Sequence, residues 1–180
     1  MDQRNERLKC AAKKWMGDVD MTKEDRKNAY LYCKFRDEQF AFYDEYAKRH
    51  GLLMKTFLVV NALFYDAVYS GGGMTQAELC QRTFQSKQMV NLIIKKLLSQ
   101  GYVTVEEAPE NKRNKVVQMT ETGRERFAKV VRHITWAEDT AMSMFTSEEQ
   151  KQLIDLSRTF TRNLAKLVHQ ETEENGYGAI

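Results

Sequence analysis

The chain has 180 residues, of which 42% are hydrophobic and 29% are charged, and its mean hydropathy is −0.61. This composition is typical of a globular protein, and a single proline with nine glycines leaves little room for disorder or for a turn-rich all-β fold. The net charge is only +3, yet residues 81–115 contain seven lysines and arginines against three glutamates, so the positive charge is concentrated in this segment.

The sequence predicts a cytoplasmic protein without a membrane segment. Its longest apolar stretch, residues 57–65, is interrupted by Asn61 and is too short to span a bilayer. The first ten residues lack the apolar core of a secretory signal. The cysteines, Cys10, Cys33 and Cys80, are odd in number and have no CxxC spacing, which is typical of reduced thiols.

Two helices are predicted before residue 70. Residues 1–21 are polar and show no clear period, which predicts a flexible arm. The stretch 22–52 is predicted as a long, aromatic-rich helix that ends at Gly51, because glycine commonly terminates helices. A second helix is predicted over residues 53–69 and is stopped by the three glycines at 71–73.

The next segment predicts a helix-turn-helix. Thr75 and Glu78 form a T-x-x-E capping box that opens a short helix. A turn over residues 83–85 follows, and Ser86 caps a second helix that ends at Gly101. The apolar residues of this second helix recur with a period of 3.6, so one face is expected to be buried. These residues are Met89, Val90, Ile93, Ile94, Leu97 and Leu98.

A β-hairpin is predicted after this helix pair. Residues 102–105 and 116–119 are rich in β-branched side chains and read as its two strands. The connection 108–115 is too long for a tight turn, so we expect it to protrude as a basic wing. The predicted fold class is therefore mainly α, with a small β-hairpin wing and a winged helix-turn-helix inside a helical dimerisation region.

Two helices are predicted after the wing. A T-x-x-E box at Thr122 and Glu125 is expected to open the first, and a box at Thr146 and Glu149 the second. The last helix carries an apolar seam suited to packing against another helix, formed by Leu153, Leu156, Phe160, Leu164 and Leu167. The predicted domains are a flexible arm (1–21), a dimerisation helix (22–52), the winged helix-turn-helix (53–122), C-terminal dimerisation helices (123–172) and a flexible tail (173–180).

Residues 74–123 resemble the MarR family of bacterial transcription regulators at four places. The family's L-T-Q-x-E-L-A corresponds to M-T-Q-A-E-L-C at 74–80, and its S-x-x-T-V-S-R corresponds to S-K-Q-M-V-N-L at 86–92. The wing motif D-R-R-x-K corresponds to N-K-R-N-K at 111–115, and L-T-x-x-G corresponds to M-T-E-T-G at 119–123. With the flanking helices, the resemblance extends over about residues 24–170.

The resemblance implies a homodimer that binds a pseudo-palindromic operator on double-stranded DNA. It also implies a transcription regulator, commonly a repressor, whose affinity for DNA falls when a small phenolic or lipophilic ligand binds. The sequence departs from the family pattern at Asn111, Leu92 and Lys95. Asn111 stands where the family usually has the wing Asp, Leu92 stands where it often has an Arg, and Lys95 stands where an acidic residue is common. Because Leu92 cannot form a bidentate guanine contact, we expect a different base preference.

The predicted DNA contacts lie at the ends of the helices and on the wing. Lys87, Gln88 and Asn91 are in the first turns of the recognition helix, where base edges come within reach. The full predicted set is Thr75, Gln76, Ser86, Lys87, Gln88, Asn91, Lys95, Lys96, Lys112, Arg113 and Lys115. A basic stretch is often only a solvated face, but here it coincides with the helix-turn-helix pattern.

Four aromatic residues are candidates for an effector pocket, although core packing explains aromatic residues at helical spacing equally well. They are Tyr30, Phe35, Phe57 and Phe64. Cys33 is expected to be a buried structural thiol, and the three scattered histidines predict no metal site and no cofactor. No catalytic motif is present, so an enzyme is not expected. Two alternatives remain open: a metal- or redox-sensing regulator, and a winged-helix adaptor that binds protein instead of DNA.

Overall fold

The computed structural model describes residues 21–108 and 111–174, and it describes the side chains of residues 21–107 and 115–169. The predicted arm lies outside the described residues except for residue 21, and the predicted tail lies outside them except for residues 173 and 174, which continue the last helix. The chain divides into two compact units. One consists of residues 34–140, and the other combines the residues up to 33 with those from 141 onward.

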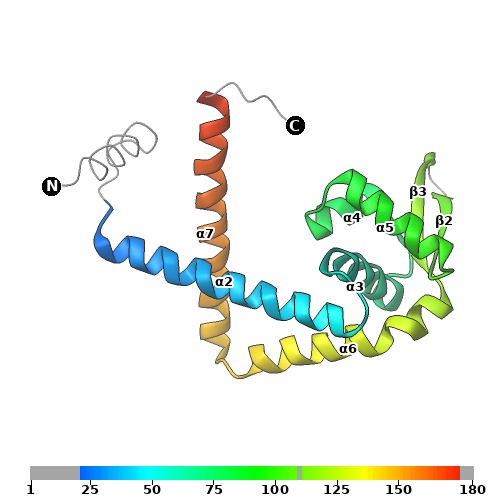
Figure 1. The fold of residues 1–180 in the computed structure, drawn as a ribbon, viewed down its shortest axis with the longest axis horizontal. Helices are drawn as coiled ribbons and strands as arrows, with labels where there is room; N and C mark the ends of the chain where they lie inside the picture. The colour runs from blue at the N-terminus through cyan, green and yellow to red at the C-terminus, as the bar shows by residue number, and fades with distance from the viewer. Residues whose placement is uncertain (1–20, 109–110, 175–180) are drawn as a thin grey trace. The chain divides into compact units, whose positions relative to one another are not determined.

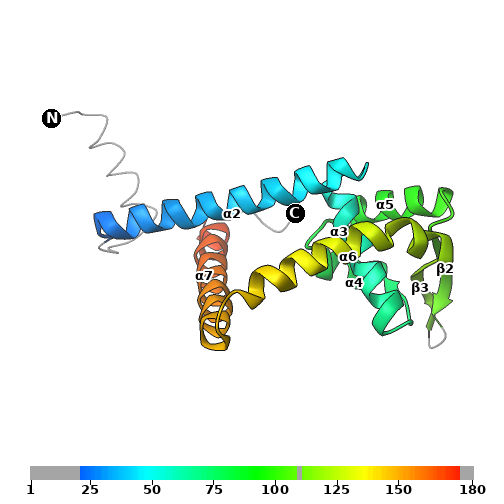
Figure 2. The ribbon, with the colours of Figure 1, turned by 90° about the horizontal axis from the view of Figure 1, so that it is seen from below.

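The described residues are mainly helical and contain one small sheet, as predicted. The helices are α2 (Lys23–Arg49), α3 (Met54–Tyr69), α4 (Gln76–Thr83), α5 (Lys87–Ser99), α6 (Glu121–Ser143) and α7 (Ser147–Glu174). The strands are β1 (Met74–Thr75), β2 (Val103–Ala108) and β3 (Asn111–Met119), which form an antiparallel sheet in the order β1-β3-β2. Within the unit 34–140, α4 and α5 lie beside the β2–β3 hairpin (Figure 1) and α6 runs past α3 (Figure 2).

The helix-turn-helix forms through the two predicted caps. The Thr75 hydroxyl accepts from the backbone N–H of Glu78 at 3.2 Å, and the Glu78 carboxylate accepts from the Thr75 N–H at 2.7 Å. Both parts of the capping box are thus confirmed. The turn passes through Phe84, whose backbone is left-handed at φ 53 and ψ 38. Ser86 then caps α5 by accepting from the N–H of Met89.

The hairpin differs from the prediction in two ways. The connection predicted over residues 108–115 is wrong, because β3 already begins at Asn111 and pairs with Ala108 after a register shift next to Glu107. Strand pairing uses backbone groups that every residue but proline carries, so the polar wing sequence does not prevent it. A third strand, β1, was not predicted; its two residues pair with Val116 and Val117 of β3.

The start of α6 also corrects the prediction. Thr120, and not Thr122, is the capping residue, because its hydroxyl accepts from the N–H of Gly123 at 3.0 Å. Thr120 also donates its own N–H to the Tyr102 carbonyl and its hydroxyl to the Gly101 carbonyl. A Cβ at Gly123 would overlap the carbonyl oxygen of Tyr102. The helix therefore begins where it packs against the end of α5 and the start of β2.

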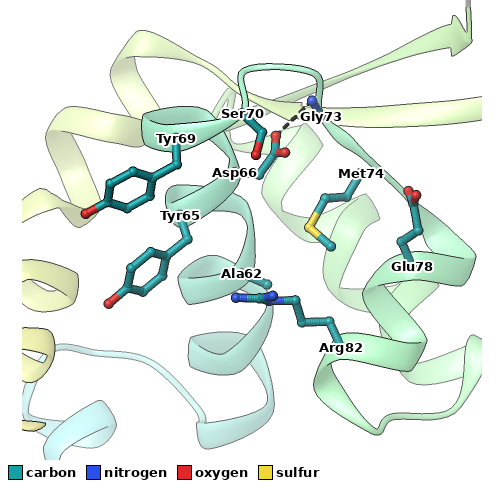
Figure 3. Close-up of a pocket in the computed structure, with 9 residues that line it drawn as sticks. All are labelled: Ala62, Tyr65, Asp66, Tyr69, Ser70, Gly73, Met74, Glu78 and Arg82. Carbon is teal, nitrogen blue, oxygen red and sulfur yellow. Dashed lines mark hydrogen bonds between the residues drawn. The ribbon is translucent and has the colours of Figure 1, made fainter.

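A glycine loop joins α3 to the sheet (Figure 3). The Asp66 carboxylate accepts from the N–H of Gly73 at 2.8 Å, and the Asp66 carbonyl accepts from the N–H groups of Ser70 and Gly71. Gly73 has a φ of 75, and a Cβ there would overlap Val116 of β3. This position therefore requires glycine both for its backbone conformation and for the close approach of the sheet.

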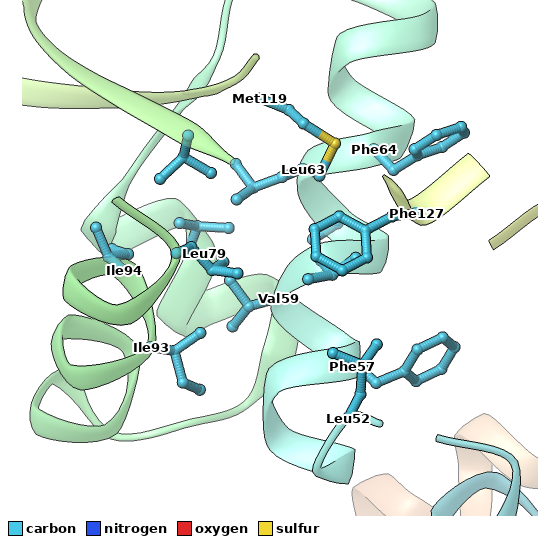
Figure 4. Packing of buried hydrophobic residues seen from close by; sticks show 14 of the residues in the cluster. Leu52, Phe57, Val59, Leu63, Phe64, Leu79, Ile93, Ile94, Met119 and Phe127 are labelled. Carbon is cyan, nitrogen blue, oxygen red and sulfur yellow. The ribbon is translucent and has the colours of Figure 1, made fainter. Parts of the chain in front are cut away.

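One hydrophobic core holds the winged unit together (Figure 4). α3 supplies a larger share of it than any other element, including Phe57 and Leu63, which are almost completely buried. α5 adds its apolar stripe, and α6 adds Phe127. Fully burying an aliphatic or aromatic side chain of this size stabilises a fold by about 1.5–3 kcal/mol, so α3 is the central support of the unit.

The C-terminal half of α2 packs on α6 inside the same unit. The Tyr46 hydroxyl donates to the Val130 carbonyl at 2.8 Å and lies 3.1 Å from Nδ1 of His133. The Tyr46 ring also contacts the ring of His50, with centroids 4.7 Å apart. Burial lowers the pKa of His50, and the neighbouring cation Lys129 lowers it further.

In the other unit, the start of α2 contacts α7 through Tyr32 and Phe160, whose ring centroids lie 4.4 Å apart. The predicted box at Thr146 and Glu149 is confirmed at the start of α7. Of the predicted α7 seam, Leu153, Leu156, Leu164 and Leu167 are exposed. Among the described helices, none alone is long and apolar enough to cross a membrane; α2 and α3 pass that test only as a pair bent by 82°.

Candidate nucleic-acid interface

α5 separates its buried residues from its polar ones. Of the predicted apolar stripe, Val90, Ile93, Ile94 and Leu97 pack into the core, Met89 is half-buried, and Leu98 is exposed, which corrects the prediction at that position. The opposite face carries only exposed side chains, namely Lys87, Gln88, Asn91, Leu92, Lys95 and Lys96. This exposed face contains three lysines and no acid, so it suits a polyanion. The predicted recognition-helix residues are thus all free of the core.

A groove of about 830 Å³ opens between α4, the first turn of α5 and β3. Four of its lining residues belong to the predicted DNA set: Thr75, Gln76, Lys87 and Lys115. The other three are Ala77, Cys80 and Gln81. The charged residues lining the groove are the two lysines, with no acid among the described residues there. The structure therefore brings residues 40 positions apart in the chain to one basic concavity.

Three of the predicted residues also position the helices. The Gln76 amide donates to the carbonyl of Lys87 at 2.9 Å, which ties the first turn of α4 to the first turn of α5. The hydroxyls of Thr75 and Ser86 are engaged in their caps. Gln76 thus links the two helices, and Thr75 and Ser86 fix where each helix begins, whatever further contacts they make. Their contact with DNA stays a prediction.

The wing supplies the remaining candidates. Lys115 is exposed on β3 opposite Glu107 of β2. Lys112 and Arg113 are on the backbone of β3, but their side chains lie outside the described residues. Their predicted roles therefore remain predictions.

Sequence reasoning missed Gln81, Cys80 and Ala77 as lining residues of the groove. Gln81 follows Ala77 by one helical turn, so both lie on the outer face of α4. This spacing could have predicted their place in the groove, because the first helix of a helix-turn-helix crosses the DNA backbone. They were not predicted because none of these residues is charged.

The four candidate effector residues have different environments. Phe57 is buried in the core, whereas Tyr30 and Phe35 are exposed on α2. Phe64 lines a cavity of about 260 Å³ between α3 and α6, and Tyr65 on the same wall shares a 2.6 Å hydrogen bond with Thr135. This cavity, which we call the α3–α6 cavity, also contains Arg132, Trp136 and Asp139.

Two of the cysteines lie among the described residues. Cys33 and Cys80 are free thiols, and both are half-buried, so the expectation that Cys33 is a buried thiol is wrong. No group of three or more His, Cys, Asp or Glu side chains able to hold a metal occurs among the described residues.

Comparison with known families identifies the winged segment. Residues 66–114 match the model of the MarR family. This segment is therefore similar to the MarR family. The match begins at Asp66 in the last turns of α3 and ends inside β3, so it contains the entire helix-turn-helix and the start of the wing. Among curated proteins, none matches the sequence.

Solved structures of MarR family regulators share the fold over most of the chain. AbsC from Streptomyces coelicolor is 18% identical, with a TM-score of 0.67 over 82% of this chain and 99% of AbsC. Sco3205 from the same organism, solved in complex with DNA, is 19% identical, with a TM-score of 0.65 over 80% of this chain and 93% of Sco3205. CouR from Rhodococcus jostii RHA1, bound to p-coumaroyl-CoA, is 17% identical, with a TM-score of 0.60 over 73% of this chain and 90% of CouR.

Proposed function

We propose that this protein is a sequence-specific DNA-binding transcription regulator of the bacterial cytoplasm, acting as a dimeric repressor. The observation that carries the proposal is the acid-free groove beside the exposed face of α5. A duplex seated there meets lysines from two elements, while the core side of α5 stays covered. In this proposal the surface binds and releases duplex DNA, and it needs no catalytic group to do so.

Within this proposal the recognition helix divides its contacts. Lys87, Gln88 and Asn91 face base edges, because the N-terminal turns of a recognition helix enter the major groove. Lys95 and Lys96 lie further along α5 and meet the phosphate backbone. The other proposed backbone contacts are Thr75, Gln76, Ser86, Lys112, Arg113 and Lys115.

A homodimer follows from the exposed apolar surface of α7. Leu156 and Leu167 are largely exposed within one chain, and they repeat at the spacing of a helix-packing seam. A second copy of the chain covers this seam and places two winged modules on a pseudo-palindromic operator.

The α3–α6 cavity is the proposed effector site. It combines the aromatic side chains Phe64, Tyr65 and Trp136 with one cation, Arg132, a composition that suits a small phenolic or lipophilic ligand. The structural relatives support both parts of the proposal by their reported complexes, one with DNA and one with p-coumaroyl-CoA.

The decisive experiment places DNA over the groove. Cys80 lines the groove, so bound duplex should slow its alkylation by a maleimide, while a C33S background removes the thiol on α2 and a C10S change removes the remaining one. The duplex is selected from the region upstream of the protein's own gene, and binding is followed by fluorescence anisotropy. If anisotropy reports binding but Cys80 reacts at an unchanged rate, DNA occupies another surface.

A salt series separates base reading from backbone contact. Lys96→Ala should weaken binding to all duplexes alike and reduce the salt dependence by about one charge per subunit. Asn91→Ala should instead lower the preference for the selected duplex over a scrambled one, by roughly 1–3 kcal/mol if it pairs with adenine. An adaptor that binds protein would show neither effect and no steep dependence on salt.

A further inference from the structure

A second cavity lies on the other side of the α3 tyrosines from the α3–α6 cavity. It has a volume of about 340 Å³ and is bounded by α3, the glycine loop, β1 and α4 (Figure 3). This size is at the lower end of the range for small-molecule sites. All of its lining residues belong to the unit 34–140, and none of them is among the proposed DNA contacts.

One cation without a partner reaches into this cavity. The side chain of Arg82 extends from α4 toward Ala62 of α3 (Figure 3). Within the part of the chain that the structure describes, its guanidinium has no hydrogen bond or ion pair. A guanidinium presents a fork of N–H donors that matches a carboxylate. The α4 wall is therefore suited to an anionic group.

Two carboxylates on the neighbouring walls carry the opposite charge. Asp66 uses Oδ2 to accept from the N–H of Gly73, and Glu78 uses Oε2 in the capping box of α4. Each carboxylate keeps its second oxygen for another donor. Asp66 faces the cavity from α3 beside the glycine loop, so an ammonium group placed there would gain a charge-assisted hydrogen bond.

The third wall is aromatic. Tyr65 and Tyr69, one helical turn apart on α3, stack with ring centroids 5.7 Å apart and an interplanar angle of 19°. The Met74 side chain lies across from them (Figure 3). Tyrosine rings and a thioether together favour a flat, apolar group, because sulfur and aromatic edges both pack well against rings.

We propose that this cavity binds a small zwitterion, an α-amino acid with an aromatic side chain. Its carboxylate pairs with Arg82, its ammonium group with Asp66, and its ring packs against Tyr65, Tyr69 and Met74. A simple anion would meet two carboxylates, and a simple cation would meet the guanidinium, so only a ligand with both charges satisfies every wall. The site shares Tyr65 and Tyr69 with the proposed effector site, but its other lining residues are different, and its occupancy does not depend on DNA binding.

The test uses the full chain without DNA and isothermal calorimetry. The probe is L-phenylalanine, and its two single-charge analogues are phenethylamine and 3-phenylpropionate. Saturable binding of L-phenylalanine, with both analogues weaker by about tenfold or more, is the expected result. Absence of saturable binding at concentrations up to about 10 mM, or equal binding of either analogue, would overturn the proposal.

Two conservative variants locate the binding. Arg82→Gln removes the exposed guanidinium, and Asp66→Asn removes a charge but keeps an oxygen that can accept from the N–H of Gly73. Each should weaken L-phenylalanine by about tenfold while far-ultraviolet circular dichroism stays unchanged. Arg132→Gln in the α3–α6 cavity is the matched control and should leave binding as it was. Loss of binding in Arg132→Gln alone would assign the amino acid to the other cavity and refute this one.

Discussion

Replacement of Phe84 by glycine should stabilise the protein. Phe84 is the one residue other than glycine with a positive φ among the described residues, and it caps the end of α4 in the left-handed conformation. A left-handed backbone costs a residue with a Cβ roughly 1–2 kcal/mol. The ring recovers almost none of this cost by packing, because Phe84 is 95% exposed.

The magnitude follows from two opposing terms. Glycine removes the steric cost, but it loses about 0.4–1 kcal/mol through the greater freedom of the unfolded chain. The net gain for Phe84→Gly over Phe84→Ala should therefore be roughly 0.5–1 kcal/mol in the free energy of unfolding. Phe84→Ala itself should differ from the parent by less than about 0.5 kcal/mol, because little buried area changes.

Urea denaturation of the three proteins measures this difference. The comparison of the glycine and alanine variants removes the contribution of the ring and leaves the backbone conformation as the variable. A glycine variant no more stable than the alanine variant would show that the left-handed turn is not strained, and the reasoning would fail. The DNA affinity of each folded variant, measured in parallel, tells whether the exposed ring contributes to binding.

Three further outcomes are expected. Gly123→Ala should lower stability by about 1–3 kcal/mol in urea denaturation, because the added methyl overlaps the Tyr102 carbonyl, whereas Gly72→Ala has open space around it and serves as the control. Burial and neighbouring cations lower the pKa of His50 in the folded protein below its ordinary value of 6.5. The contribution of His50 to the free energy of unfolding is therefore complete above pH 6.5 and is lost as the pH falls through the lowered pKa. The urea midpoint of the parent protein should decrease over this pH range by an amount that His50→Gln does not show, and an identical pH dependence of the two proteins would contradict this expectation. Leu156→Glu should shift the protein from dimer to monomer in light scattering, because this side chain is 70% exposed within one chain.

Local signals were sufficient where both partners of an interaction lie within a few residues. The capping box of Thr75 and Glu78 and the cap at Ser86 follow from hydrogen bonds across three positions, so the sequence predicts them directly. The apolar stripe of α5 likewise predicts which face of the recognition helix is buried. The exposed polar face, and with it most of the candidate site, follows from the same periodicity.

Contacts between distant segments explain the errors. The sequence offers both Thr120 and Thr122 as the cap of α6, and Thr122 has the better local pattern because Glu125 follows it. The choice is made by the carbonyls of Gly101 and Tyr102, about 19 positions earlier, to which only Thr120 is bound. No local pattern contains that information.

The groove shows the same limit for the candidate site. Lys87 and Lys115 are predicted as separate cations on a helix and a wing, and only the packing of β3 beside α4 gives them a shared concavity. Gln81 enters the site by this packing alone. The strand β1 depends on the glycine loop, which brings two residues against β3 after α3 has ended.

The separation of the two faces of α5 has an evolutionary consequence. Substitutions on its exposed face, at Gln88, Asn91 or Leu92, remove no core contact, and such surface changes usually alter stability by less than about 0.5 kcal/mol. The inward residues, such as Val90 and Ile93, have no such freedom. Under the proposed function, a lineage carrying this module can therefore exchange one operator for another in single steps, and each intermediate remains folded while selection acts on DNA binding.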